Sequence, residues 1–125
     1  MNQITQSFIA AGAITEFALV SVDTAGKVIV TTAATDTRCI GVAQRAASTG
    51  ESVDVIISGL TRVISGAAGV ADSVSLVMAD AGGTVLAHAT ANNYSIGSVI
   101  PNINQASSSN GDQILINFTG PQNKI

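Results

Sequence analysis

A phrase of about twenty residues occurs twice in this chain. Residues 23–43 read DTAGKVIVTTAATDTRCIGVA, and residues 80–99 read DAGGTVLAHATANNYSIGSV. At an offset of 57, residues 19–37 and 76–94 share six identities in nineteen positions. A one-residue deletion then aligns Ile40-Gly41 with Ile96-Gly97. Two copies of about 55 residues predict one domain that is built from two similar halves.

The similarity extends beyond this phrase at both ends. Ala11–Ile14 aligns with residues 67–70, and Gly50–Val53 aligns with residues 111–114. We therefore expect a domain of two repeats with short segments outside it. The predicted parts are an N-terminal arm over residues 1–8, a single β domain over 9–120 with repeat halves at about 7–59 and 63–120, a longer loop over 101–110, and a tail over 121–125.

Each copy contains the pattern of a β-hairpin. The β-rich run Leu19–Val22 is followed by the turn residues Asp23–Gly26 and a second β-rich run, Lys27–Thr32. An aspartate at the start of a turn hydrogen-bonds nearby backbone, and a glycine at its end supplies a positive φ. The second copy repeats this pattern at Asp80–Gly83. The repeated Asp and Gly therefore have a structural explanation.

The last strand of each copy alternates apolar and polar side chains. Val53, Val55 and Ile57 share one face of the first, and Ile114, Ile116 and Phe118 share the matching face of the second. No long stretch has the apolar spacing of a helix, and short strands separated by Gly-rich turns are typical of barrels and sandwiches. The predicted fold class is all-β: a compact β-barrel-like or β-sandwich-like single domain.

The composition excludes several classes of partner. Hydrophobic residues make up 46% of the chain and charged residues only 10%, against about 25% in typical domains. The net charge is −3 and the five basic residues are isolated from one another, so we expect no nucleic-acid binding. The N-terminus lacks the pattern of a signal peptide, and no apolar run approaches the length of a membrane span. We therefore expect no membrane partner.

The residues that carry chemistry in enzymes are too few and too scattered here. His88 is the only histidine and Cys39 the only cysteine, which is too few for a metal site or a nucleophilic pair. We expect Cys39 to be a small buried side chain. The Gly26-Lys27 pair lacks the rest of a phosphate-binding loop, and Lys27 lacks the neighbours of a lipoyl-type lysine. A carboxylate pair for glycoside hydrolysis stays open on spacing, but the chain has no Trp for stacking a sugar. We predict no catalytic residues, no metal and no cofactors.

Five segments of the chain carry a characteristic order of turn glycines and core valines: Ala11–Ile14, Val22–Val28, Ile40–Ala43, Gly50–Val55 and Ser58-Gly59. This order resembles the small capsid decoration, or cement, proteins of tailed bacteriophages. The resemblance covers residues 11 to about 75 best and the remainder through the repeat.

The resemblance implies a structural virion protein that is not an enzyme. It would be made in the host cytoplasm and would bind the outer capsid surface, with the major capsid protein and copies of itself, as a homotrimer, as partners. The arm would dock on the capsid by strand addition, with Ile4 and Phe8 as apolar anchors. The expected capsid-binding residues are Asn2, Gln3, Ile4, Thr5, Gln6, Ser7 and Phe8. The alternative is a receptor- or glycan-binding head or tail fibre module that uses the loop over 101–110.

Overall fold

The protein is described from a computed structural model that covers residues 3–32, 38–66, 70–71, 76–87, 95–100, 107–108 and 113–122. Within these ranges the regular structure is β-strand, apart from one 3₁₀ turn, η1, at Ala81–Gly83. The strands are β1 (Ile4–Ile9), β2 (Leu19–Val22), β3 (Val28–Val30), β4 (Cys39–Ala43), β5 (Ser52–Ile64), β6 (Val70–Ala71), β7 (Leu76–Ala79), β8 (Val85–Ala87), β9 (Ser95–Val99), β10 (Ser107–Ser108) and β11 (Gln113–Gln122). The predicted all-β class is confirmed.

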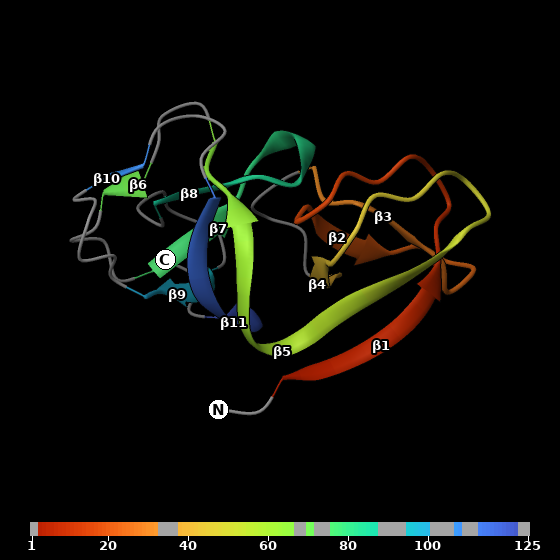
Figure 1. Ribbon diagram of the computed structural model, residues 1–125, viewed down its shortest axis with the longest axis horizontal. Coiled ribbons are helices and arrows are strands. Elements are labelled where there is room, and N and C mark those ends of the chain that lie inside the picture. The colour runs from red at the N-terminus through yellow and green to blue at the C-terminus, as the bar shows by residue number, and fades with distance from the viewer. Residues whose placement is uncertain are drawn as a thin grey trace.

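Nine of these strands form one curled antiparallel sheet (Figure 1). Its order is β3-β2-β4-β5-β11-β9-β7-β8, and β1 pairs with β5 beside this path. The small strands β6 and β10 pair with each other separately. The long strand β5 lies in the middle of the sheet and pairs with β4 on one side and β11 on the other. It therefore connects the two parts of the sheet into one barrel-like body.

The two ends of the sheet repeat the same ladder. Strands β3-β2-β4 followed by residues 52–58 of β5 form an N-terminal half, and β8-β7-β9-β11 together with residues 59–64 of β5 form a C-terminal half. Val20 pairs with Gly41 before a register shift, and Val77 pairs with Gly97 before the same shift. We call two residues equivalent when they hold the same ladder position in the two halves.

The two glycines in this ladder are required by close packing. A Cβ atom at Gly97 would lie 2.6 Å from the carbonyl oxygen of Asn117, and one at Gly41 would collide with the equivalent oxygen of Ile56. Real Cβ atoms do not approach backbone this closely, so only glycine fits at either position. This requirement explains why the Ile-Gly pair recurs in the sequence.

The predicted hairpins are confirmed in both halves. The backbone N–H of Asp23 donates to the oxygen of Lys27 at 2.7 Å, and that of Asp80 donates to the oxygen of Thr84 at 2.8 Å. Gly26 closes the first turn at a φ of 81°, where a residue with a side chain would be strained. Both turns were therefore predicted correctly from the sequence.

The structure adds one equivalence that the alignment missed. Ile9 pairs with Ser52, the first residue of β5, and Ile64 pairs with Gln113, the first residue of β11. Since Ser52 aligns with Gln113, β1 occupies in the N-terminal half the place that residues 59–64 of β5 occupy in the C-terminal half. Strand β5 thus crosses the segment between the two predicted repeats.

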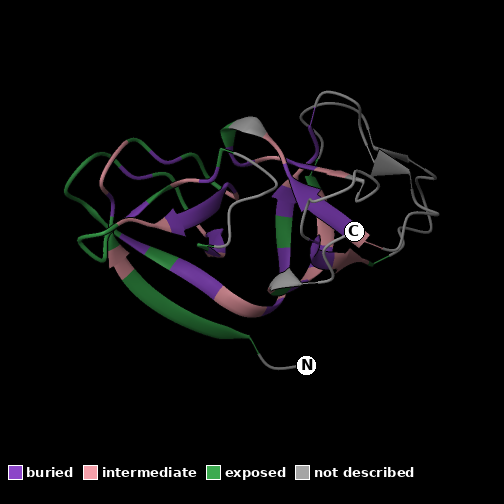
Figure 2. Ribbon diagram, turned by 180° about the vertical axis from the view of Figure 1, so that it is seen from behind, coloured by how far each residue is buried: buried purple, intermediate pink, exposed green. Residues whose placement is uncertain are grey.

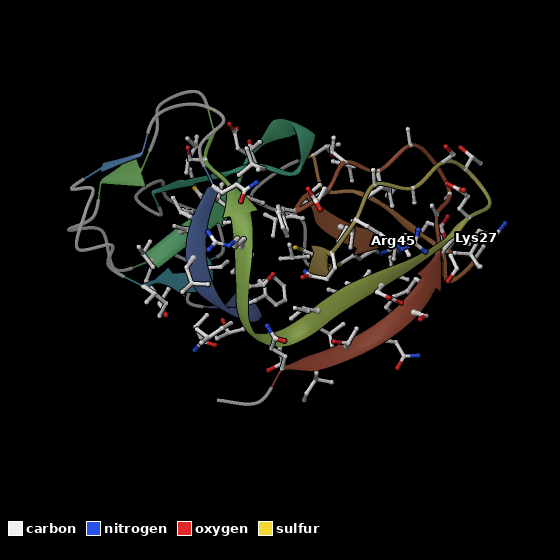
Figure 3. The ribbon with its side chains drawn as sticks, in the orientation of Figure 1. Lys27 and Arg45 are labelled. Atoms are coloured by element: carbon white, nitrogen blue, oxygen red, sulfur yellow. The ribbon has the colours of Figure 1, made fainter. Side chains whose placement is uncertain are left out.

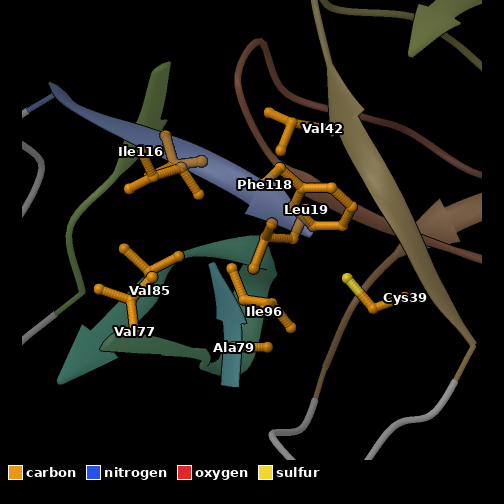
Figure 4. Close-up of a cluster of buried hydrophobic side chains, with 10 residues drawn as sticks. Leu19, Cys39, Val42, Val77, Ala79, Val85, Ile96, Ile116 and Phe118 are labelled. Atoms are coloured by element: carbon orange, nitrogen blue, oxygen red, sulfur yellow. The ribbon is translucent and has the colours of Figure 1, made fainter. Parts of the chain in front are cut away.

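Two apolar clusters form the core, one for each half. The faces predicted from alternation are confirmed, because Val53 and Val55 lie in one cluster and Ile116 and Phe118 in the other. The second cluster also includes side chains of the N-terminal half, and Figure 4 shows Leu19 beside the ring of Phe118. The two halves are therefore joined by apolar packing as well as by β5.

Candidate interaction surfaces

The predicted arm is strand β1, and it lies along β5. Residues 5–9 pair with residues 52–56 in regular antiparallel register, with an irregularity between Ile4 and Thr5. Five of the six residues of β1 are exposed, and Figure 2 shows this exposure along the strand next to the N-terminus. Of the expected capsid-binding residues, Asn2 lies outside the described ranges. Of the others, Gln3 directly precedes β1, and Ile4 to Phe8 lie along it.

Few side chains hold β1 in place. The Gln3 Nε2 donates to the carbonyl oxygen of Leu60 at 2.6 Å, and the Ser7 hydroxyl donates to Asp54 Oδ1 at 2.9 Å. Ile4 is 54% exposed, whereas Phe8 is half-buried and packs against the N-terminal core. Backbone pairing to β5 is therefore the main attachment of the strand, and Phe8 is its apolar anchor within the chain.

One backbone edge of β1 pairs with β5, and the opposite edge faces outward. The N–H of Ala10 donates to the oxygen of Glu51 at 2.9 Å, so Ala10 points its backbone groups at the β5 side. Because this direction alternates along a strand, Phe8 and Gln6 also point toward β5, and Ser7 and Thr5 point away from it. Within the described residues no strand pairs with the outer edge of β1 at Thr5 and Ser7, whereas just beyond the end of β1 an isolated bridge joins Ala10 to Val28 of β3. The edge at Thr5 and Ser7 can accept an additional strand.

A second surface is an open apolar hollow of about 400 Å³ beside β1. Its lining comes from β1, β2, β4, β5 and β11, so it lies where the inner face of the N-terminal half meets β11 of the C-terminal half. The lining residues are Phe8, Val22, Cys39, Ile40, Ile57, Phe118 and Gly120. Since its wall is almost wholly apolar, the hollow offers apolar contact area.

The charged side chains do not converge on a site in the described part of the chain. Lys27 and Arg45 lie at the end of the N-terminal half where β1 ends (Figure 3). The Arg45 guanidinium donates to the backbone oxygen of Ser52, which is a structural contact. Among the described residues no three His, Cys, Asp or Glu side chains are grouped to hold a metal ion. Cys39 is 2% exposed, as expected for a small buried side chain.

Two further sequence predictions meet the limits of the described ranges. His88 and most of the loop over 101–110 lie outside them. The recognition role of this loop, on which the fibre alternative depends, therefore stays a prediction. No helix in the described residues is long and apolar enough to cross a membrane.

The comparisons with known proteins give a fold and no family. No family model matches the chain, and no curated protein matches it. Its fold is similar to that of a solved phage head-fibre base. This structure is described as the crystal structure of head fiber gp8.5 N base in bacteriophage phi29, with a TM-score of 0.71 and 12% identity. The match covers 99% of this chain and 100% of that chain.

The sequence predicted the arm as a contact surface, but it predicted neither the pairing of β1 with β5 nor the hollow. Residues 4–8 read ITQSF, which has no apolar alternation to indicate a paired strand. The hollow depends on which residues of the two halves cover one another, and that information lies in the tertiary packing. The structure reveals the hollow through a difference in burial: Ile40 is half-buried, whereas its equivalent Ile96 is fully buried.

Proposed function

We propose that this chain is a structural protein of a tailed-bacteriophage virion that binds the outer capsid surface as a decoration protein. The observation that carries the proposal is the fold similarity to a phage head-fibre base over the full length of both chains. The segment resemblance to cement proteins points to the same location. In this role the chain stabilises contacts between major capsid subunits and performs no reaction.

The outer edge of β1 is the proposed capsid contact. A capsid strand that pairs with this edge gains main-chain hydrogen bonds to the outward backbone groups of Thr5 and Ser7. This differs from docking by a free arm, because β1 keeps its pairing with β5 while the new strand adds on the other side. Ile4, at 54% exposed, supplies an apolar contact beside that strand.

Several copies acting together would hold the lattice more firmly than one. A homotrimer that engages three sites at once gains avidity, since the second and third contacts form at a high effective concentration. Capsid stabilisation then follows from mass action, because the protein binds the assembled lattice in preference to dissociated subunits.

The second candidate is the base of a head fibre, and the similar solved structure favours it because that structure is itself such a base. Both candidates require attachment to the head. They differ in what the attached protein does, since a fibre base presents a recognition module and a decoration protein raises the stability of the capsid.

Mixing the purified protein with undecorated heads tests the proposal. We expect ordered density on the outer surface by electron cryomicroscopy and a higher temperature of genome release. Binding without any gain in head stability would favour the fibre base. Absence of binding at saturating protein would contradict both.

A matched pair of substitutions at Ser7 tests the strand edge. Ser7→Ala removes the hydroxyl contact with Asp54 and keeps the outward N–H, so head occupancy should stay unchanged. Ser7→Pro also removes that N–H, which an edge strand tolerates in the folded chain. Loss of one main-chain hydrogen bond should weaken head binding by about tenfold. Equal binding by the two variants would exclude strand addition at this edge.

A further inference from the structure

The inner face of the C-terminal half is covered by the N-terminal half. Four of its residues, from β5, β7, β9 and β11, are each at most 3% exposed: Val63, Ala79, Ile96 and Phe118. They share one apolar cluster with three residues of the N-terminal half: Leu19, Cys39 and Val42. Figure 4 shows Leu19 and Val42 against the ring of Phe118. The outer side of one half thus covers the inner side of the other.

Among the described residues, the equivalent four residues of the N-terminal half have no such cover. Each of them is half-buried, and all four line the open hollow: Phe8, Val22, Ile40 and Ile57. The correspondence is position by position, since Phe8 pairs with Val53 as Val63 pairs with Ile114. The hollow is therefore the place where the N-terminal half lacks the partner that its counterpart has.

A second contact between the halves shows the same asymmetry. The N–H of Gly83 donates to the oxygen of Thr31 at 2.9 Å, and a Cβ at Gly83 would lie 2.9 Å from the Cβ of Ala18. The turn of the C-terminal half is thus seated on the N-terminal half. At Gly26, the equivalent of Gly83, an added Cβ would meet nothing within 4 Å. The N-terminal turn is exposed, and none of the described residues packs against it at Gly26.

We propose that a second copy of this chain covers the hollow, and that it repeats between molecules the packing seen between the halves. The covering surface would be the outer side of the C-terminal half, where Leu76 is equivalent to Leu19 and Ser98 to Val42. These residues pair with each other as Leu19 pairs with Val42, and both are half-buried. The same docking seats the Gly26 turn on the second copy.

This association is head-to-tail. Each copy uses two different surfaces, the hollow of its N-terminal half and the outer side of its C-terminal half, so the interface is heterologous. It supplies the self-contact that the proposed trimer requires, and it does not depend on head binding. A symmetric pairing of two hollows, or a capsid segment in the hollow, are the competing occupants.

Complementary variants test the head-to-tail arrangement by sedimentation velocity. The wild-type chain should self-associate, and Leu76→Asp or Ile57→Asp should each weaken association by more than about tenfold, as a central apolar contact does. An equimolar mixture of the two variants keeps one intact hollow and one intact outer surface, so it should form dimers and nothing larger. Ile29→Asp changes an exposed strand residue elsewhere and should leave association unchanged.

A second variant at an exposed position tests the same interface in case Ile57→Asp does not fold. Gly26→Asn places a side chain on the exposed turn, and asparagine tolerates the positive φ there. The free chain has room for this side chain, but the seat that holds Gly83 within the chain would not accommodate it between copies. We expect loss of association with unchanged circular dichroism.

Three results would overturn the inference: a wild-type chain that remains monomeric at every concentration, an Ile29→Asp variant that dissociates as readily as Leu76→Asp, or folded complementary variants that fail to pair when mixed. Head binding by a monomeric chain would leave the proposed function standing and remove the interface. Head-to-tail association without head binding would do the reverse.

Discussion

The two halves of this protein share a ladder of strands but differ in how each is completed. The C-terminal half takes its first strand from the continuation of β5 and its cover from the outer side of the N-terminal half. The N-terminal half takes its first strand from β1, near the chain terminus, and has an open hollow where the cover would lie. Equivalent residues therefore have the same backbone environment and different burial.

This comparison separates ladder geometry from apolar cover. The glycines, register shifts and turns are alike because they are set within each half. The burial of the inner face differs because it is set by what packs from outside. Substitutions at equivalent positions should accordingly have equal effects where the ladder decides and unequal effects where the cover decides.

The largest difference is expected at a pair of equivalent isoleucines. Ile96 is 1% exposed, and Ile96→Ala should lower the free energy of unfolding by about 3–4 kcal/mol, since it leaves a cavity in packed surroundings. Ile40 lines the open hollow, and Ile40→Ala should cost about 1–2 kcal/mol. Urea unfolding of dilute protein measures both. Equal losses under these conditions would show that the hollow is already filled in the monomer.

Measuring Ile40→Ala and Ile96→Ala at several protein concentrations tests whether the hollow is covered by a second copy. If a second copy covers the hollow, Ile40 becomes buried on association, and Ile40→Ala then also weakens self-association. The gap between the two variants should narrow as the concentration rises, while the cost of Ile96→Ala stays constant. A gap that is independent of concentration would contradict the proposed interface.

Equal effects are expected at the two ladder glycines. Gly41→Ala and Gly97→Ala each place a methyl group against the backbone of the adjacent strand, so each should lower the unfolding free energy by about 2–3 kcal/mol. Gly12→Ala is the control, because a Cβ there meets nothing within 4 Å and the backbone φ is not positive. Thermal unfolding of the three variants checks this. A harmless change at either ladder glycine would contradict the repeated packing.

Much of the fold could be predicted because its signals are local. The Asp–Gly turns, the alternation in Val53–Ile57 and the recurrence of Ile-Gly each depend on a few neighbouring residues, and each specifies its element directly. These signals gave the fold class and the inner faces of the last strands.

The pairing of β1 with β5 and the hollow could not be predicted because their signals are not local. Strand β1 and residues 59–64 of β5 are equivalent in the structure, but at the offset of 55 that aligns them they share little beyond Ile9 and Ile64. Backbone hydrogen bonds hold β1, and these place few demands on side chains. The hollow brings Phe8 and Ile40 of the N-terminal half together with Phe118 of the C-terminal half, residues that lie far apart in the chain.

The smallest difference is expected at the two repeated aspartates. Asp23 Oδ1 accepts hydrogen bonds from the N–H groups of Ala25 and Lys27, both at 2.9 Å, whereas Asp80 makes no such side-chain bond at the start of η1. Asp23→Ala should therefore lower the unfolding free energy by about 1 kcal/mol, and Asp80→Ala by only a few tenths.

The two aspartate variants are compared by urea unfolding, with Asp23→Asn as the control because its amide oxygen can still accept both bonds. Asp23→Asn should retain most of the stability that Asp23→Ala loses. If Asp80→Ala instead costs as much as Asp23→Ala, the aspartate stabilises both turns through a contact other than these two hydrogen bonds. The turns would then belong with the ladder features that the halves share. If the costs differ as expected, the same residue in the same turn position has kept its place in the sequence while its bonds to the backbone differ between the halves.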